Sequence, residues 1–189
     1  MAEITLEAAP TLGGAEITVG GNRITERADL ALVSVATPMG GDDALAMALE
    51  SGWSLSPPDP TLSSTAGDTR ALRTAPDQIL LIFPHATPDA EALVQAKLDG
   101  AGYTTDQTDA WVVLELSGPD THAALERLCP IDLDPTVFPD GAAARTVMEH
   151  MGAIILRQGA DSFLVMSANS SAGSFLHAVE TSYRYVAPP

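Results

Sequence analysis

The segment from Cys129 to Phe138 holds two closely spaced aspartates, which are the first candidates for chemistry in this 189-residue chain. Asp132 and Asp134 lie two residues apart, so their carboxylates could share one face of the chain as an acid–base pair or a cation site. A turn whose aspartates accept hydrogen bonds from backbone N–H groups explains the same spacing, and we expect this simpler arrangement. The segment would then be structural, with Leu133 and Phe138 packed inward.

Histidines, the commonest metal ligands, are isolated from one another in the sequence. The chain has four of them, at His85, His122, His150 and His177. No two form an H-x-x-x-H pair on one helix face, so a zinc or iron site would need convergence in the fold. We expect His122 and His177 to lie on solvated helix faces and His150 to lie in a strand.

The nucleophile candidates also lack a neighbouring base. Cys129 is the only cysteine, so it forms no intrachain disulfide and is expected to be a small buried residue. Ser170 and Ser171 lack the G-x-S-x-G elbow and are interpreted as part of a helix cap. Asp106 and Asp109 pose the same choice between a turn and a site as the first pair. We therefore predict no catalytic, cofactor-binding or metal-binding residue in this chain.

The charge balance excludes several classes of partner. The chain carries 25 acidic and nine basic residues, for a net charge of −16, and Lys97 is its only lysine. Nucleic acids and anionic membranes require clustered cations, so neither is an expected partner. No apolar run approaches the roughly 20 residues of a membrane span. The first ten residues lack the pattern of a secretory signal, and we expect a cytoplasmic protein.

Hydrophobic periodicity predicts the strands and helices that must position these residues. The expected strands are 30–36, 70–74, 77–83, 103–108, 111–116, 145–149, 153–157 and 163–166. Helices are expected from Asp42 to Glu50, from Thr87-Pro88-Asp89 to Gly100, from Ser117-Gly118-Pro119-Asp120 with Pro119 in the first turn, and after a cap at Asn169 or Ser170. Residues 54–68 are rich in Pro, Ser and Thr and are expected to be loop. The strand from Trp111 to Leu116 alternates two faces.

The order strand, helix, strand, strand, helix occurs twice. The apolar strands that follow Asp77 and Asp161 occupy matching places in the two series. Such a series is the split β-α-β arrangement, with helices on one face of an antiparallel sheet. We therefore predict an α+β fold of two ferredoxin-like halves in one body, residues 29–108 and 109–189. Residues 1–28 are expected to be a loosely attached N-terminal arm with one edge strand.

A longer pattern around the first segment resembles a known family. It reads Asp106-x-x-Asp109-x-Trp111, Leu114-x-Leu116-x-Gly118-Pro119, Cys129-Pro130-Ile131-Asp132-Leu133-Asp134-Pro135, Phe138-Pro139 and Gly141 with Thr146. The string CP-hydrophobe-DL-x-P-x-x-FP-x-G is the specific part. The pattern is similar to that of gamma subunits of heterotetrameric sarcosine oxidases, over about residues 22 to 186. Two positions depart from the family pattern. Ile79 stands where a tryptophan is common, and Asp134 stands where a histidine is frequent.

The resemblance implies a non-catalytic subunit of a complex that oxidatively demethylates sarcosine to glycine. The products would be hydrogen peroxide and either formaldehyde or methylene-tetrahydrofolate. FAD, FMN, NAD and tetrahydrofolate are implied for the large alpha and beta subunits and zinc for the small delta subunit, with no cofactor in this chain. The alpha subunit is the implied docking partner, with beta and delta as further candidates. The implied fold is that of the folate-binding aminomethyltransferases.

Two further readings of the chain stay open at this point. The main alternative is a free-standing folate-binding protein or aminomethyltransferase-like enzyme, in which Asp106, Asp109 or Asp132 would hold the pterin. A scaffold protein unrelated to amine oxidation is the other. The substrate could also be another N-methyl amine. For a docking surface, the expected contributors are Trp53, Tyr183, Arg184 and Tyr185.

Overall fold

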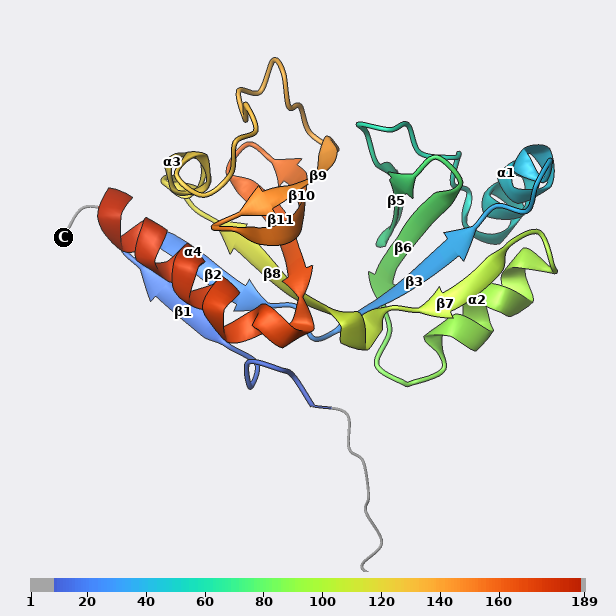
Figure 1. Ribbon diagram of the computed structural model, residues 1–189, viewed down its shortest axis with the longest axis horizontal. Helices are drawn as coiled ribbons and strands as arrows, with labels where there is room; N and C mark the ends of the chain where they lie inside the picture. The colour runs from blue at the N-terminus through green and yellow to red at the C-terminus, as the bar shows by residue number, and fades with distance from the viewer. Residues whose placement is uncertain (1–8, 188–189) are drawn as a thin grey trace, which may run out of the picture.

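The computed structural model describes residues 9–187, which form two antiparallel sheets covered by helices (Figure 1). The first sheet contains β3 (Leu30–Ala36), β4 (Ser64–Ala66), β5 (Thr69–Ala75), β6 (Gln78–Pro84) and β7 (Tyr103–Asp106). The second contains β1 (Glu16–Val19), β2 (Asn22–Glu26), β8 (Trp111–Ser117), β9 (Ala143–Met148), β10 (Met151–Gly159) and β11 (Ser162–Ala168). The helices are α1 (Asp42–Trp53), α2 (Ala90–Leu98), α3 (Thr121–Glu126) and α4 (Ala172–Val186).

The first half has the predicted ferredoxin-like topology. Its sheet order is β4-β5-β6-β3-β7, so the two strands that precede helices, β3 and β6, lie side by side in the middle. The strands β5 and β7 flank them, which is the strand order of the split β-α-β unit. Helices α1 and α2 pack against each other and cover one face of this sheet. One detail is wrong in the prediction, because the expected loop 54–68 includes the short strand β4.

The second half repeats this topology but takes its last strand from the N-terminus. Its sheet order is β1-β2-β8-β11-β10-β9. Strands β8 and β11 match β3 and β6, as predicted for the paired segments 79–83 and 163–166. The place beside β8 that a strand after α4 would fill is taken by β2, which pairs antiparallel with β8. The predicted loose arm with one edge strand is therefore wrong for residues 16–26, whereas the boundary at residue 108 stays a prediction.

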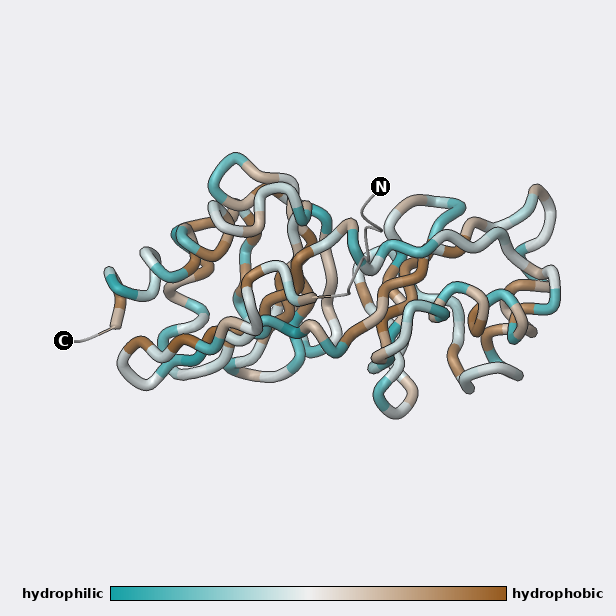
Figure 2. Tube along the Cα trace, turned by 90° about the horizontal axis from the view of Figure 1, so that it is seen from below, coloured by the Kyte–Doolittle hydropathy of each residue, from teal (hydrophilic) through white to brown (hydrophobic). Residues whose placement is uncertain are grey.

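The two sheets pack face to face, so the central strands are buried on both sides. In β11, Phe163 and Val165 face α3 and α4, whereas Leu164 and Met166 face the other sheet. The core between the sheets consists of Leu30, Leu32, Leu72, Leu80, Ile82, Val113, Ile154, Leu156, Leu164 and Met166. Burial on both faces explains why the sequence of these strands is continuously apolar. Figure 2 shows these hydrophobic stretches inside the halves and where they meet.

Several helix starts differ from the prediction. Helix α3 begins at Thr121 and not at Pro119, and the Asp120 carboxylate accepts from the Asn22 amide and not from its own helix. Before α4, residues Asn169–Ser171 form a 3-10 turn without a side-chain cap. These ends depend on tertiary contacts that local sequence does not contain. Within residues 9–187 no helix is long and apolar enough to cross a membrane.

Candidate functional site

A buried arginine holds the segment between α3 and β9, which carries Asp132 and Asp134, from its inner side. Arg157 is 1% exposed, and its guanidinium donates to the carbonyl of Leu133. It also donates to the Ala160 carbonyl at 2.9 Å and lies over the Phe163 ring, 4.6 Å from its centroid. The carbonyl of Leu133 accepts a second hydrogen bond from Nε2 of His122 at 2.9 Å. The expectation that His122 is merely solvated is therefore wrong.

The aspartates of this segment lie on its outer side and shape its turns. The Asp132 carboxylate accepts from the Asp134 backbone N–H at 3.0 Å, and the Asp134 carboxylate accepts from the N–H and hydroxyl of Thr136. These Thr136 hydrogen bonds lower the pKa of Asp134. Leu133 and Phe138 are buried beneath them. The expected structural turn is confirmed, and the two carboxylates act as backbone acceptors.

Removing the Asp132 carboxylate should cost little, because the turn is exposed to water. We expect Asp132→Ala to lower the free energy of unfolding by about 0.5 kcal/mol, since water can satisfy the freed Asp134 N–H. Asp140→Ala is the matched control, because Asp140 is an exposed aspartate of the same loop without a hydrogen bond among the described residues. Urea unfolding followed by circular dichroism measures both. Unchanged stability of the Asp132 variant together with a loss of subunit assembly would show a functional role instead.

The cysteine and the remaining histidines, which were candidates for catalysis or metal binding, either form structural contacts or are exposed to solvent. Burial raises the pKa of the Cys129 thiol, which donates weakly to the Leu125 carbonyl at 3.4 Å. His150 lies in the β9–β10 turn with a φ of 72° and not in a strand, contrary to expectation. His85 contacts Asp89 and Thr87 near the start of α2, and His177 is exposed as expected. In residues 9–187, no three His, Cys, Asp or Glu side chains are arranged to hold a metal ion.

A small cleft of about 280 Å³ lies where the two halves meet, and it contains two of the three carboxylates considered for a pterin. Asp106 and Asp109 line it together with Trp111, whereas Asp132 does not. The Asp106 carboxylate is already engaged, because it accepts from the Thr108 N–H at 2.8 Å. The predicted carboxylate set is thus only partly brought together.

An ion-pair cluster beside this cleft fixes the crossing from one sheet to the other. Arg27 lies between β2 and β3, and its guanidinium donates to Asp29 at 2.8 Å and to Glu115 of β8 at 2.5 Å. The hydrogen bond from Arg27 is the main cause of a lowered pKa of Asp29. The same contact raises the pKa of Arg27. The cluster therefore ties the connection between β2 and β3 to β8.

The Asp29 pair gives the chain a specific acid sensitivity. We expect Asp29→Asn to lower the free energy of unfolding by about 0.5–1 kcal/mol at neutral pH, because the pair is partly exposed. The pKa of Asp29 in the folded chain lies below its unfolded value of about 3.9. The stabilisation by the ion pair is therefore fully present above the unfolded pKa and is lost as the pH falls through the folded pKa. Urea unfolding of both chains at falling pH should therefore give stabilities that converge below about pH 4. A difference that stays constant with pH would contradict this.

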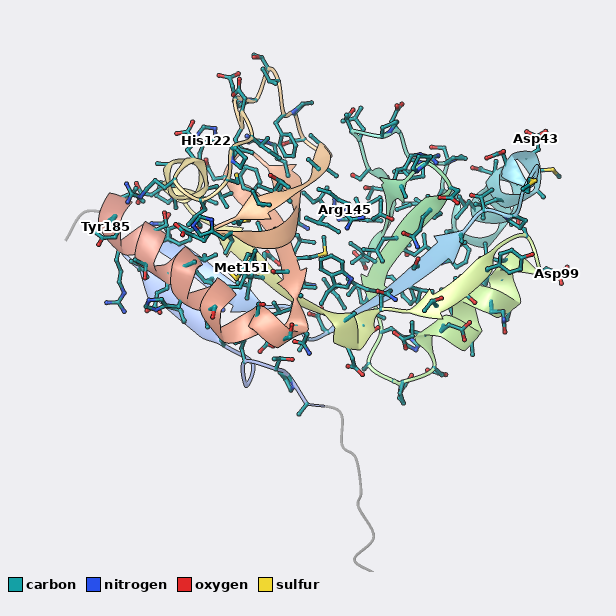
Figure 3. All side chains as sticks on the ribbon, in the orientation of Figure 1. Asp43, Asp99, His122, Arg145, Met151 and Tyr185 are labelled. Atoms are coloured by element: carbon teal, nitrogen blue, oxygen red, sulfur yellow. The ribbon has the colours of Figure 1, made fainter. Side chains whose placement is uncertain are left out.

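A larger, open cleft of about 730 Å³ lies at the other end of the junction. One wall is the proline-rich loop 57–60, and the opposite wall carries Arg73 at the end of β5 and Arg145 of β9. Arg73 donates to the carbonyls of Pro58 and Pro76 at 2.9 and 2.8 Å. Arg145 donates to the Thr74 carbonyl at 3.3 Å, and Figure 3 shows it in the space between the two halves. No feature of the sequence pattern indicated this cleft.

The aromatic residues expected on a docking surface divide into buried and exposed ones. Tyr183 is fully buried, and its hydroxyl donates to the Thr121 hydroxyl. The expectation that Tyr183 contributes to a docking surface is therefore wrong. Burial raises the pKa of Tyr183 to about 12. Tyr185 is 72% exposed and Arg127 lies over its ring, whereas Trp53 is half-buried beneath Lys97. Arg184 is exposed and paired with Glu180.

Comparison with known families and curated proteins gives consistent matches. Residues 39–183 match the model of the family described as sarcosine oxidase, gamma subunit. A sarcosine oxidase subunit gamma from Corynebacterium sp. strain P-1 is 29% identical over 85% of this chain and 79% of its own length. The subunit gamma from an Arthrobacter species is 30% identical over 79% of this chain and 73% of its own.

Two solved structures share the fold. A chain of the heterotetrameric sarcosine oxidase from Corynebacterium sp. U-96 in complex with pyrrole 2-carboxylate superposes with a TM-score of 0.78 and 22% identity. The match covers 92% of this chain and 90% of that one. The glycine cleavage system aminomethyltransferase T from Bartonella henselae superposes with a TM-score of 0.60 and 14% identity, over 85% of this chain and 45% of that one. The expected likeness to the aminomethyltransferase fold is thus confirmed.

Proposed function

The chain belongs to the sarcosine oxidase gamma subunit family, and we propose that it works as a non-catalytic gamma subunit within a heterotetrameric sarcosine oxidase. The observation that carries the proposal is the family match over residues 39–183. This range contains every strand of the first sheet except β3 and the strands β8 to β11 of the second sheet, including the segment from Cys129 to Gly141. The proposed reaction of the whole complex is the oxidative demethylation of sarcosine to glycine with release of peroxide, in the cytoplasm.

The roles found for the polar residues support a structural contribution. Cys129 is buried, His122 and Arg157 hold the Leu133 carbonyl, and Asp132 closes a turn. These four candidate groups are thus engaged in holding the fold. In the proposal, FAD, FMN, NAD, tetrahydrofolate and zinc bind to the other subunits, and the fate of the one-carbon unit is decided there.

The partner proposed for this chain is the large alpha subunit, with beta and delta as further neighbours. Support comes from the name of the solved relative, which is a heterotetrameric enzyme. The alternative, a free-standing folate-binding enzyme, is not favoured. Its three candidate carboxylates do not converge, since Asp106 and Asp109 line one cleft while Asp132 belongs to another loop.

The isolated chain tests the non-catalytic part of this proposal. We expect purified chain to be colourless and to produce no peroxide when sarcosine is added. Added FAD, FMN and tetrahydrofolate should not change its melting temperature, because ligands that bind the folded state raise it. Flavin absorption in the purified chain, a ligand-dependent rise in melting temperature, or sarcosine-dependent peroxide would overturn the proposal.

A further inference from the structure

The larger cleft arises because a proline-rich loop leaves the edge of a sheet. The loop before β4 begins to pair with the second sheet, since Ala143 donates to the Thr61 carbonyl at 2.9 Å and Ser63 donates to the Gly141 carbonyl at 2.7 Å. Continuing this pairing along β9 would require residues 57–60 as donors, but three of these four are prolines without an N–H. The loop therefore diverges from β9 and leaves a cleft of about 730 Å³ beside it.

The strand that borders the cleft has a free edge. Among residues 9–187, β9 is the last strand of its sheet and pairs with β10, and its other edge carries only the short contact between Ala143 and Thr61. The Ala143 N–H points away from β10, because it donates to the Thr61 carbonyl. The Ala142 carbonyl points toward β10, because it accepts from the Arg157 N–H. Backbone groups alternate along an antiparallel strand, so the N–H groups of Arg145 and Val147 point away from β10 into the open edge. The Val147 side chain is 50% exposed beside them.

The cleft also holds positive charge that no carboxylate of the described residues neutralises through an ion pair. Elsewhere on the surface, Arg23, Arg27 and Arg184 pair with carboxylates. The guanidinium groups of Arg73 and Arg145 instead contact only backbone carbonyls among residues 9–187. Asp59 lines the cleft but forms no ion pair with either of them. In a chain with a net charge of −16, two unpaired guanidinium groups in one cleft are a distinct feature.

We propose that an extended acidic segment of another oxidase subunit binds in this cleft by adding a strand to β9. Its backbone carbonyls accept from the N–H groups of Arg145 and Val147, as in peptide recognition by strand addition. One of its carboxylates lies against the Arg145 guanidinium, which can donate two parallel hydrogen bonds. Only an extended chain uses both the backbone edge and the charge, so the occupant is a peptide segment and not a small anion. This inference rests on the proposed function, because it names the face by which the subunit assembles.

The test uses the complex itself. The chain is co-expressed with the alpha, beta and delta subunits, a tag is placed on alpha, and the retained amount of this chain is measured against salt and dilution. Arg145→Glu reverses the charge in the cleft, and Val147→Pro removes an outward N–H without touching the ladder to β10. Arg23→Glu is the matched control, because Arg23 is an exposed arginine on β2, outside the cleft and not among the residues expected on a docking surface. Melting temperatures of the isolated chains confirm folding.

We expect Arg145→Glu to weaken association by about tenfold or more and Val147→Pro to weaken it as well, while Arg23→Glu binds as the wild type does. If Val147→Pro fails to fold, Arg145→Glu still decides the matter. Wild-type retention together with equal retention of a folded Arg145→Glu variant would overturn this docking face and leave the proposed function standing. Failure of the wild-type chain to be retained would overturn both.

Discussion

Replacing Arg157 by methionine should lower the free energy of unfolding by about 3 kcal/mol, among the largest effects we expect for a single side chain. The methionine fills similar space but leaves the carbonyls of Ala160 and Gly159 without their donor. The Leu133 carbonyl keeps its hydrogen bond from His122, which limits the loss. Relief from the cost of burying a charge offsets a further part of it. Urea unfolding of the isolated chain measures the result.

The matched control for this change is Arg184→Met, because Arg184 is exposed and its pair with Glu180 is a surface contact. We expect that control to alter stability by less than about 0.5 kcal/mol. Hydrogen exchange should also become faster in residues 129–141 of the Arg157 variant, since the guanidinium anchors this segment through Leu133. Equal stability of the two variants would mean that Leu133 and Phe138 hold the segment by packing alone.

Replacing Gly118 by alanine should detach the N-terminal hairpin from the second sheet, at a cost of about 3–5 kcal/mol. Gly118 has a φ of 127°, which side-chain-bearing residues rarely adopt. A Cβ there would lie 2.6 Å from Oδ1 and 2.7 Å from Cα of Asn22, and 2.8 Å from the Gly21 carbonyl oxygen. Two of these are backbone atoms of the β1–β2 hairpin, so they cannot move aside without shifting β2 from β8.

Gly152→Ala is the control for that change, because a Cβ at Gly152 meets no atom within 4 Å. We expect the control to fold normally with at most a small change in stability. Limited proteolysis should cleave the Gly118 variant near residues 9–29 much faster than the control. If the two variants were cleaved at the same rate and unfolded at the same urea concentration, β2 would not depend on this close approach.

The parts of the fold that sequence predicts are those in which local pattern and burial agree. β3, β6, β8 and β11 are continuous or alternating apolar runs, and each is buried as such a pattern requires. The turn at Asp132 was predictable for the same reason, because aspartate side chains bond to nearby backbone. In these places the interacting residues are close in the sequence, so the local sequence is enough to predict the structure.

The parts that sequence misses depend on distant partners. The strand β2 reads NRITE and has only Ile24 as an apolar residue, so nothing in it indicates pairing with β8. Arg157 follows the apolar run of β10 and resembles an exposed strand end, yet an irregularity between Arg157 and Gly159 accompanies its burial. The double role of the Leu133 carbonyl likewise appears only when α3 and β10 come together. The close approach of Gly118 to Asn22 is also a contact between residues that are distant in the sequence.

Assembly with the other oxidase subunits is the claim on which this account depends, and native mass spectrometry tests it most directly. All four subunits are co-expressed with the tag on alpha, and the purified complex is compared with one made without this chain. We expect a single species whose mass includes one copy of this chain beside alpha, beta and delta. Without the chain, the remaining subunits should give a smaller and less stable assembly. A complex of unchanged mass and stability that leaves this chain free in solution would contradict the account.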